Sequence, residues 1–62
     1  MNQLTYRQLR TLQALQLLET GLPQIVDSQD AEELVDMSYA TVLPDGNYRI
    51  TPGGRQKLAE KQ

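Results

Sequence analysis

Apolar and polar residues alternate over residues 39–51, and this period of two is typical of β-strands. The alternation is interrupted by Pro44-Asp45-Gly46, in which proline suits a type I turn and glycine suits the left-handed position of a bulge. The pattern therefore predicts a β-hairpin in which Leu43 lies opposite Asn47. The predicted core-facing side of this hairpin comprises Ala40, Val42, Tyr48 and Ile50.

Leucines at helical spacing predict a first helix over residues 6–20. Thr5 and Gln8 have the spacing of a capping box at its start. At its end Gly21 fits a left-handed position in a Schellman motif, and Pro23 prevents the helix from continuing. Both ends of this helix are therefore marked in the sequence.

The leucines of this first helix cover an unusually wide arc of its circumference. A helix with such an arc either lies at the centre of its domain or pairs with a second subunit, and the sequence leaves both alternatives open. The residues expected at a dimer contact are Tyr6, Leu9, Leu17 and Leu18.

A connector over residues 22–27 follows, in which Ile25 and Val26 are expected to reach the core. A second helix is predicted to begin near Ser28 or Asp30, either of which could cap it, and to end near residues 37–38. Its apolar face is narrow and consists of Ala31, Leu34 and Val35.

A last helix is predicted over residues 53–61, with Thr51 as its N-cap and Pro52 at its first position. Leu58 and Ala59 are the apolar residues that it could bury. The whole chain, residues 1–62, is thus expected to form a single α+β domain with the order helix, helix, β-hairpin, helix.

Sixty-two residues without Phe, Trp or Cys make a small core that no disulfide can reinforce. Association into a homodimer would supplement such a core, so we expect a homo-oligomer. No apolar run is long enough for a membrane span or a signal peptide, which indicates a cytoplasmic protein without membrane contact.

The residue types that most enzymes use are scarce, because there is no His or Cys and both serines lie at expected helix ends. We therefore expect no enzymatic activity, catalytic residue, metal or cofactor. Four acids on the second helix lack the ligand-bearing loop that a divalent ion prefers, so a solvated face is favoured. Gly53-Gly54-Arg55 could hold an anion, although a structural helix start is the favoured interpretation.

Charge is distributed unevenly, since residues 11–48 contain seven acids and no Lys or Arg. Four of these acids lie on the second helix, where they either solvate its outer face or meet a basic surface on a partner protein. The expected partner-binding set is Asp30, Glu32, Glu33, Asp36, Met37, Tyr39 and Leu43.

Residues 32–58 resemble the second half of a bacterial winged helix domain, in which a helix, a strand, a "DG" turn and a "Y-x-I-T-x-x-G-R" strand precede a helix. LTYRQLRTLQAL also resembles the first helix of such a domain. The resemblance implies that residues 28–38 fill the recognition-helix position and residues 44–47 the wing. The matching residues are Asp45, Gly46, Tyr48, Ile50, Thr51, Gly54 and Arg55.

DNA binding, the usual function of that family, requires positive charge, whereas this recognition-helix position carries four acids and no base. We therefore expect a non-enzymatic protein-interaction or dimerisation module that acts as a regulatory accessory. The alternative is a small dimeric DNA-binding regulator that uses its wing and C-terminal helix. Its nucleic-acid contacts would be Asn47, Arg49, Arg55 and Lys57.

Overall fold

The computed structural model describes residues 4–60 and confirms the expected α+β fold with its order of helix, helix, hairpin and helix. The two strands form one antiparallel sheet. The elements are α1 (Tyr6–Glu19), α2 (Ser28–Asp36), β1 (Ala40–Val42), β2 (Tyr48–Ile50) and α3 (Pro52–Ala59).

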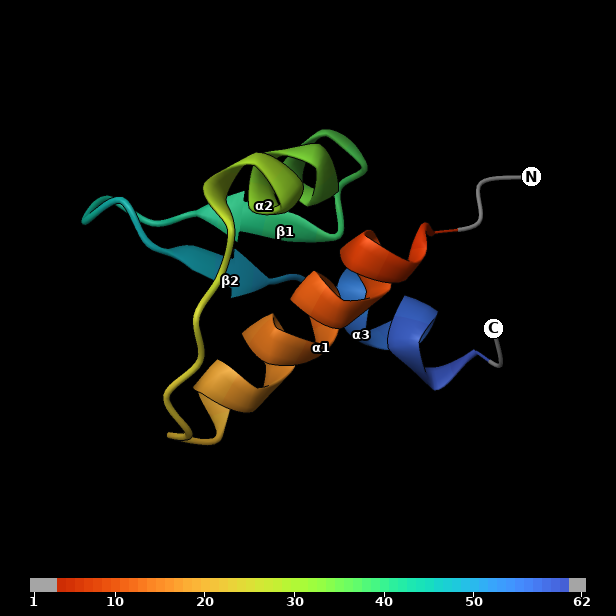
Figure 1. The fold of residues 1–62 in the computed structure, drawn as a ribbon, viewed down its shortest axis with the longest axis horizontal. Coiled ribbons are helices and arrows are strands. Elements are labelled where there is room, and N and C mark those ends of the chain that lie inside the picture. Colours follow the sequence, from red (N-terminus) through yellow and green to blue (C-terminus); the bar gives the residue numbers. More distant parts are fainter. Residues whose placement is uncertain (1–3, 61–62) are drawn as a thin grey trace.

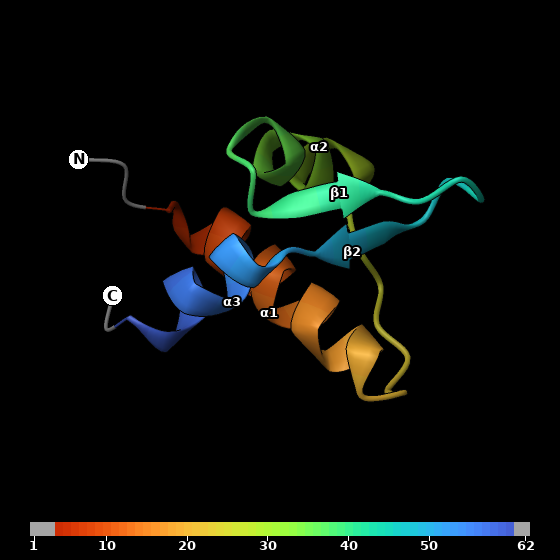
Figure 2. The same cartoon turned by 180° about the vertical axis from the view of Figure 1, so that it is seen from behind.

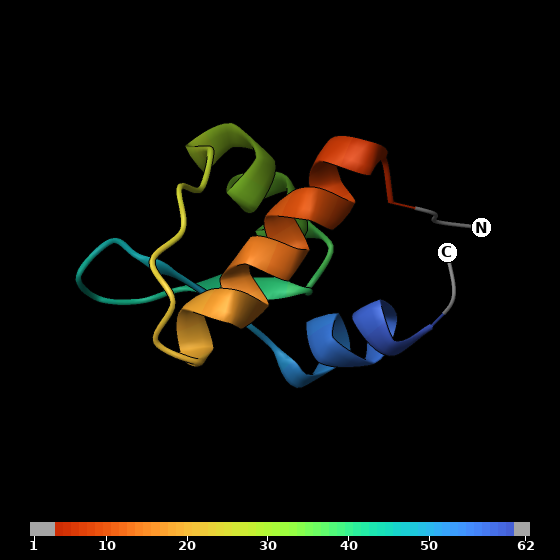
Figure 3. The same ribbon diagram turned by 60° about the horizontal axis from the view of Figure 1, so that its bottom comes forward.

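Helix α1 occupies the central position, because it contacts α2, β2 and α3. Helix α2 lies over β1, and the tip of the hairpin projects away from the helices (Figures 1 and 2). Figure 3 views α1 from the side that none of the other described elements covers. This helix therefore has one face in the core and the opposite face free.

Both predicted ends of α1 are confirmed. The Thr5 amide donates to the Gln8 side chain (3.0 Å), and the Gln8 amide donates to Thr5 Oγ1 (3.1 Å). At the other end Gly21 has a φ of 89°, and the Leu22 amide donates to the Leu17 carbonyl (3.2 Å) as in a Schellman motif. The helix itself ends one residue earlier than expected, at Glu19.

The N-cap of α2 differs from the prediction, because Asp27 caps the helix and Ser28 and Asp30 do not. One oxygen of Asp27 accepts hydrogen bonds from the amides of Gln29 (2.8 Å) and Asp30 (3.2 Å). Ser28 and Asp30 are both suitable cap residues by type, but they occupy the first and third positions of the helix, so neither lies at the cap itself.

The hairpin has the predicted register, with Ala40 opposite Ile50 and Val42 opposite Tyr48. Its turn is closed by hydrogen bonds from the Leu43 amide to the Asn47 carbonyl (2.7 Å) and from the Gly46 amide to the Leu43 carbonyl (2.9 Å). Gly46 has a φ of 89°, as a left-handed turn position requires.

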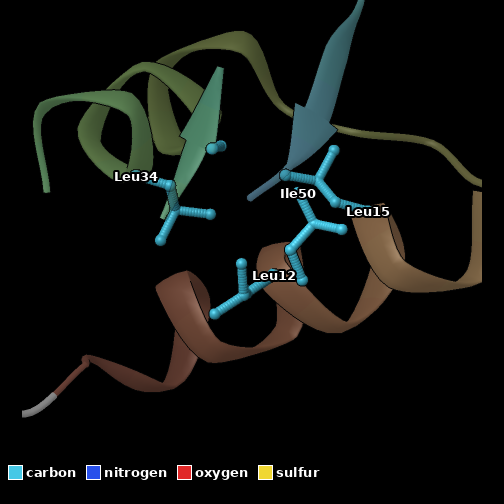
Figure 4. Close-up of a cluster of buried hydrophobic side chains, with 5 residues drawn as sticks. Leu12, Leu15, Leu34 and Ile50 are labelled. Carbon is cyan, nitrogen blue, oxygen red and sulfur yellow. The ribbon is translucent and has the colours of Figure 1, made fainter. Parts of the chain in front are cut away.

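The core lies where α1, α2 and the base of the hairpin meet (Figure 4). Two expectations about it were wrong. Val42 is half exposed because the hairpin runs past the edge of the helices, and Ile25 is fully exposed because the connector passes outside the core. Val26 does pack against the core. The buried residues of this cluster are Leu12, Leu15, Leu34, Ala40 and Ile50.

Thr51 caps α3 as predicted, since its hydroxyl oxygen accepts from the Gly54 amide (3.1 Å) while it donates to the Ser38 carbonyl (2.8 Å). The helix spans Pro52–Ala59, so the expected bounds were shifted, and Lys61 lies outside the described residues. Of the two expected apolar contacts, Leu58 is half-buried and Ala59 is exposed. Gly54 is instead the buried residue of α3.

Candidate interaction surfaces

The four acidic residues of α2 lie in different environments. Asp30 is buried, and its carboxylate lies 3.3 Å from Arg7 Nη2, where it ties α2 to α1. Glu33 is half-buried and accepts a hydrogen bond from Gln8 Nε2 (2.9 Å). Both acids thus support the packing of two helices.

The other two acids of α2, Glu32 and Asp36, are exposed, and we call them the acidic face. Glu32 accepts a hydrogen bond from the Tyr48 hydroxyl (3.3 Å). Burial raises the pKa of Tyr48, and the charge and hydrogen bond of Glu32 raise it further. The acidic face is therefore continuous with the hairpin at this contact.

The three apolar residues predicted beside the acids are not equally available to a partner. Met37 and Tyr39 are half-buried and pack against the core. Leu43 is also half-buried, but it lies in the hairpin loop and lines a groove. Leu43 is consequently the best placed of the three to touch a partner.

The predicted nucleic-acid contacts are engaged within the chain. Arg49 Nε lies 2.9 Å from one oxygen of Glu19, and Arg55 is paired with the other oxygen of the same carboxylate. Lys57 Nζ lies 3.3 Å from Glu60. Asn47 donates to the Asp45 carboxylate from both its amide (3.0 Å) and its side chain (3.1 Å).

Glu19 was not singled out from the sequence, yet it joins α1 to β2 and α3 and leaves only 20% of its side chain exposed. The sequence does contain a signal for its role, because Glu19 is the only acid of α1 and lies at the C-terminal end of the helix. The helix dipole disfavours an acid there. Such a position indicates that the carboxylate has cationic partners elsewhere.

An open groove of about 840 Å³ lies between the end of α1, the connector and the hairpin. The Glu19–Arg49–Arg55 cluster lines one part of it, and apolar side chains such as Leu15 and Leu18 line another. The groove therefore combines apolar surface with a charge cluster that keeps one net positive charge, because two arginines share one carboxylate.

The predicted dimer residues lie on two sides of α1. Tyr6 and Leu17 are on the uncovered side, with 73% and 39% of their surface exposed. Leu18, at 37%, lines the groove instead, and Leu9 is half-buried. On the uncovered side the Arg10 guanidinium carbon lies 5.9 Å from the centre of the Tyr6 ring.

Exposed apolar residues of the connector extend the uncovered side of α1. Leu22 is about half exposed and Ile25 is fully exposed. Ile25 borders a shallow depression of about 530 Å³ together with Arg10, Leu17 and Asp27. Apolar surface here is flanked by one cation and one anion.

Within residues 4–60, no group of three or more acidic, His or Cys side chains is arranged to hold a metal ion. None of the helices in this part of the chain has both the length and the apolar character needed to span a membrane.

No protein-family model matches this chain, and comparisons with curated proteins and with solved structures also find no match. The arrangement of three helices and a two-stranded hairpin is compatible with a winged-helix-like layout.

Proposed function

We propose that this protein is a non-enzymatic, winged-helix-like protein-interaction and dimerisation module that acts as a regulatory accessory. Its α2 occupies the position of a recognition helix and presents the acidic face to a basic surface on a partner protein. Complementary charge of this kind speeds association and selects the partner, while apolar contacts supply much of the affinity.

The observation that carries the proposal is the pairing of positive charge inside the chain. Each of the five Lys and Arg residues among residues 4–60 contacts a carboxylate or an aromatic ring of the same chain. DNA affinity depends on cations that neutralise phosphates. A duplex would have to compete for the arginines while α2 brings acids toward its backbone.

One observation favours the alternative, a small dimeric DNA-binding regulator. Arg49 on β2 and Arg55 on α3 meet at Glu19, and their side chains are still 60% and 51% exposed. Exposed ion pairs contribute only about 0–1 kcal/mol. Phosphate groups could therefore draw both arginines away from Glu19, and a dimer would present two such pairs.

The proposal is tested by capturing partners with the protein and with a variant whose acidic face is neutralised, Glu32→Gln with Asp36→Asn. Glu33 is left intact because it supports helix packing. The variant Glu60→Lys is the control, since it also raises the net charge by two units but lies beyond α3, at its exposed C-cap.

We expect the neutralised variant to lose at least one partner that the unchanged protein and Glu60→Lys both retain. For a retained partner, association at low salt should be several-fold slower with the neutralised variant. If both variants capture the same partners with equal association rates, the acidic face has no role in binding.

A further inference from the structure

Four residues on the uncovered side of α1 form a row with the spacing of a helix-pairing seam. Successive members are four, three and four residues apart, which is the repeat that lets two helices pack along their length. Three of them, Tyr6, Arg10 and Gln13, are exposed, and Leu17 keeps 39% of its surface exposed. The row comprises Tyr6, Arg10, Gln13 and Leu17.

We propose that this row is covered by a second copy of the chain, with the two α1 helices packed antiparallel about a two-fold axis. The inference deepens the proposed function and rests on it, because it assigns the dimerising surface. In this arrangement Tyr6 of each copy packs on Leu17 of the other, and Arg10 lies opposite Gln13.

The order of residues along the row favours the antiparallel arrangement. When the second helix runs in the opposite direction, the aromatic end of one row meets the aliphatic end of the other. The same surface is then complementary to itself, as a two-fold contact requires. A parallel pair would instead place Arg10 against Arg10, and two like charges facing each other are unfavourable. Arg10 opposite Gln13 avoids that contact and offers a hydrogen-bond acceptor to the guanidinium.

Charges beside the row also fit a second copy. Arg10 and Asp27 line the same depression, so each copy brings one cation and one anion to the same region of the contact. Asp27 uses one carboxylate oxygen to cap α2, and its second oxygen can accept from Arg10 of the other copy. No acid of α2 is needed in this contact, so the acidic face remains available to another partner.

Residues of the connector extend the proposed contact beyond α1. Ile25 is fully exposed on the rim of the depression, and Leu22 is about half exposed where α1 ends. Leu17 of α1 and Ile25 of the connector line the same depression, and exposed apolar side chains that lie together mark a surface for association. The antiparallel arrangement brings the two connectors to the same side of the helix pair.

The first test is sedimentation velocity over a range of protein concentrations with three forms of the protein. We expect the unchanged chain to dimerise and Leu17→Lys to weaken the dimer at least tenfold. Leu18→Lys is the matched control, since its position is 37% exposed but lies in the groove. It should dimerise like the unchanged chain. Circular dichroism shows whether each variant is folded.

The second test distinguishes the orientation by mixing Tyr6→Glu with Leu17→Lys, each of which should be monomeric alone. In an antiparallel pair the new Glu faces the new Lys while the other Tyr6–Leu17 contact is retained, so the mixture should form heterodimers. A parallel pair gives no such rescue. Variants that stay monomeric when mixed would overturn the proposed orientation.

The outcomes separate this inference from the proposed function. A monomer at every concentration, or a dimer disrupted by Leu18→Lys and not by Leu17→Lys, overturns the inference, while partner capture through the acidic face would still stand. The chain could also prove to be a monomer that captures another protein, and Tyr6→Glu could abolish that capture. In that case the row binds a different protein and the inference is wrong.

Discussion

Two residues show how tightly the backbone is constrained where α2, the hairpin and α3 meet. Gly54 lies so close to its neighbours that an added Cβ would overlap the Tyr39 carbonyl oxygen and lie 2.8 Å from Ile50 Cγ1. Ser38 has a φ of 68°, a left-handed conformation that favours glycine. The same junction therefore requires a glycine at one position and places a serine at another.

Gly54→Ala should destabilise the protein, because the Cβ meets backbone that cannot move aside. Overpacking of this kind costs roughly 1–3 kcal/mol, and each kcal/mol lowers the melting temperature by about 4–8 °C in a domain of this size. Gly53→Ala is the control, since the nearest atom to its Cβ is 3.6 Å away. Thermal unfolding followed by circular dichroism should show a loss for Gly54→Ala alone; equal melting temperatures would contradict the packing of α3.

Ser38→Gly should raise the stability, because glycine adopts the left-handed conformation without steric cost. The relief of about 1–2 kcal/mol is partly offset by the greater freedom of glycine in the unfolded chain, about 0.4–1 kcal/mol. We therefore expect a gain of up to about 1.6 kcal/mol in chemical denaturation. Ser38→Ala keeps the strain and should show no gain, and a less stable glycine variant would contradict this account.

At the scale of elements, polar contacts join the same elements that the apolar core packs together. Glu19 holds β2 and α3 against the end of α1, Asp30 holds α2 against its start, and Tyr48 of β2 donates to Glu32 of α2. The first two contacts join opposite charges. The third places an ionisable hydroxyl beside a carboxylate, which makes it sensitive to pH.

Stability should fall more steeply above pH 10 in this protein than in Tyr48→Phe. Burial and Glu32 raise the pKa of Tyr48 above its ordinary value of 10.0, so the fold favours the neutral phenol. Its contribution is therefore fully present below the unfolded pKa and is lost as pH rises through the folded pKa. Melting temperatures between pH 8 and 11 test this, and parallel declines for both forms would contradict it.

The sequence predicted those elements whose signals are local. The capping box of Thr5 and Gln8, the left-handed glycines 21 and 46 and the hairpin register each depend on a few neighbouring residues. Ile25 and Val42 were misplaced because alternation and hydrophobicity do not show where the core ends. Whether an apolar residue is buried depends on where the other elements pack.

The candidate surfaces were predicted less completely, for the same reason. The acids of α2 could be read from the sequence, but Asp30 is buried and paired with Arg7, which lies 23 positions away. Arg49 and Arg55 were singled out as cations, whereas their shared partner Glu19 precedes them by 30 and 36 positions. Such pairings depend on the fold and have no local signature.

At the scale of the whole molecule, the positive and negative side chains differ in their contacts within the chain. The described cations each contact a carboxylate or an aromatic ring of the same chain, while two acids of α2, Glu32 and Asp36, remain exposed. The uncovered side of α1 carries apolar residues. This distribution supports contacts with proteins more than contacts with a duplex.

The most direct measurement is a fluorescence-anisotropy titration of labelled duplex DNA with the protein at low and at physiological salt. Our account predicts weak binding at low salt and none at physiological salt, because Arg49 and Arg55 are held by Glu19 and the exposed acids of α2 repel phosphate. Sub-micromolar binding at physiological salt would contradict it, if the affinity also fell steeply with salt and was lost in Arg49→Ala or Arg55→Ala.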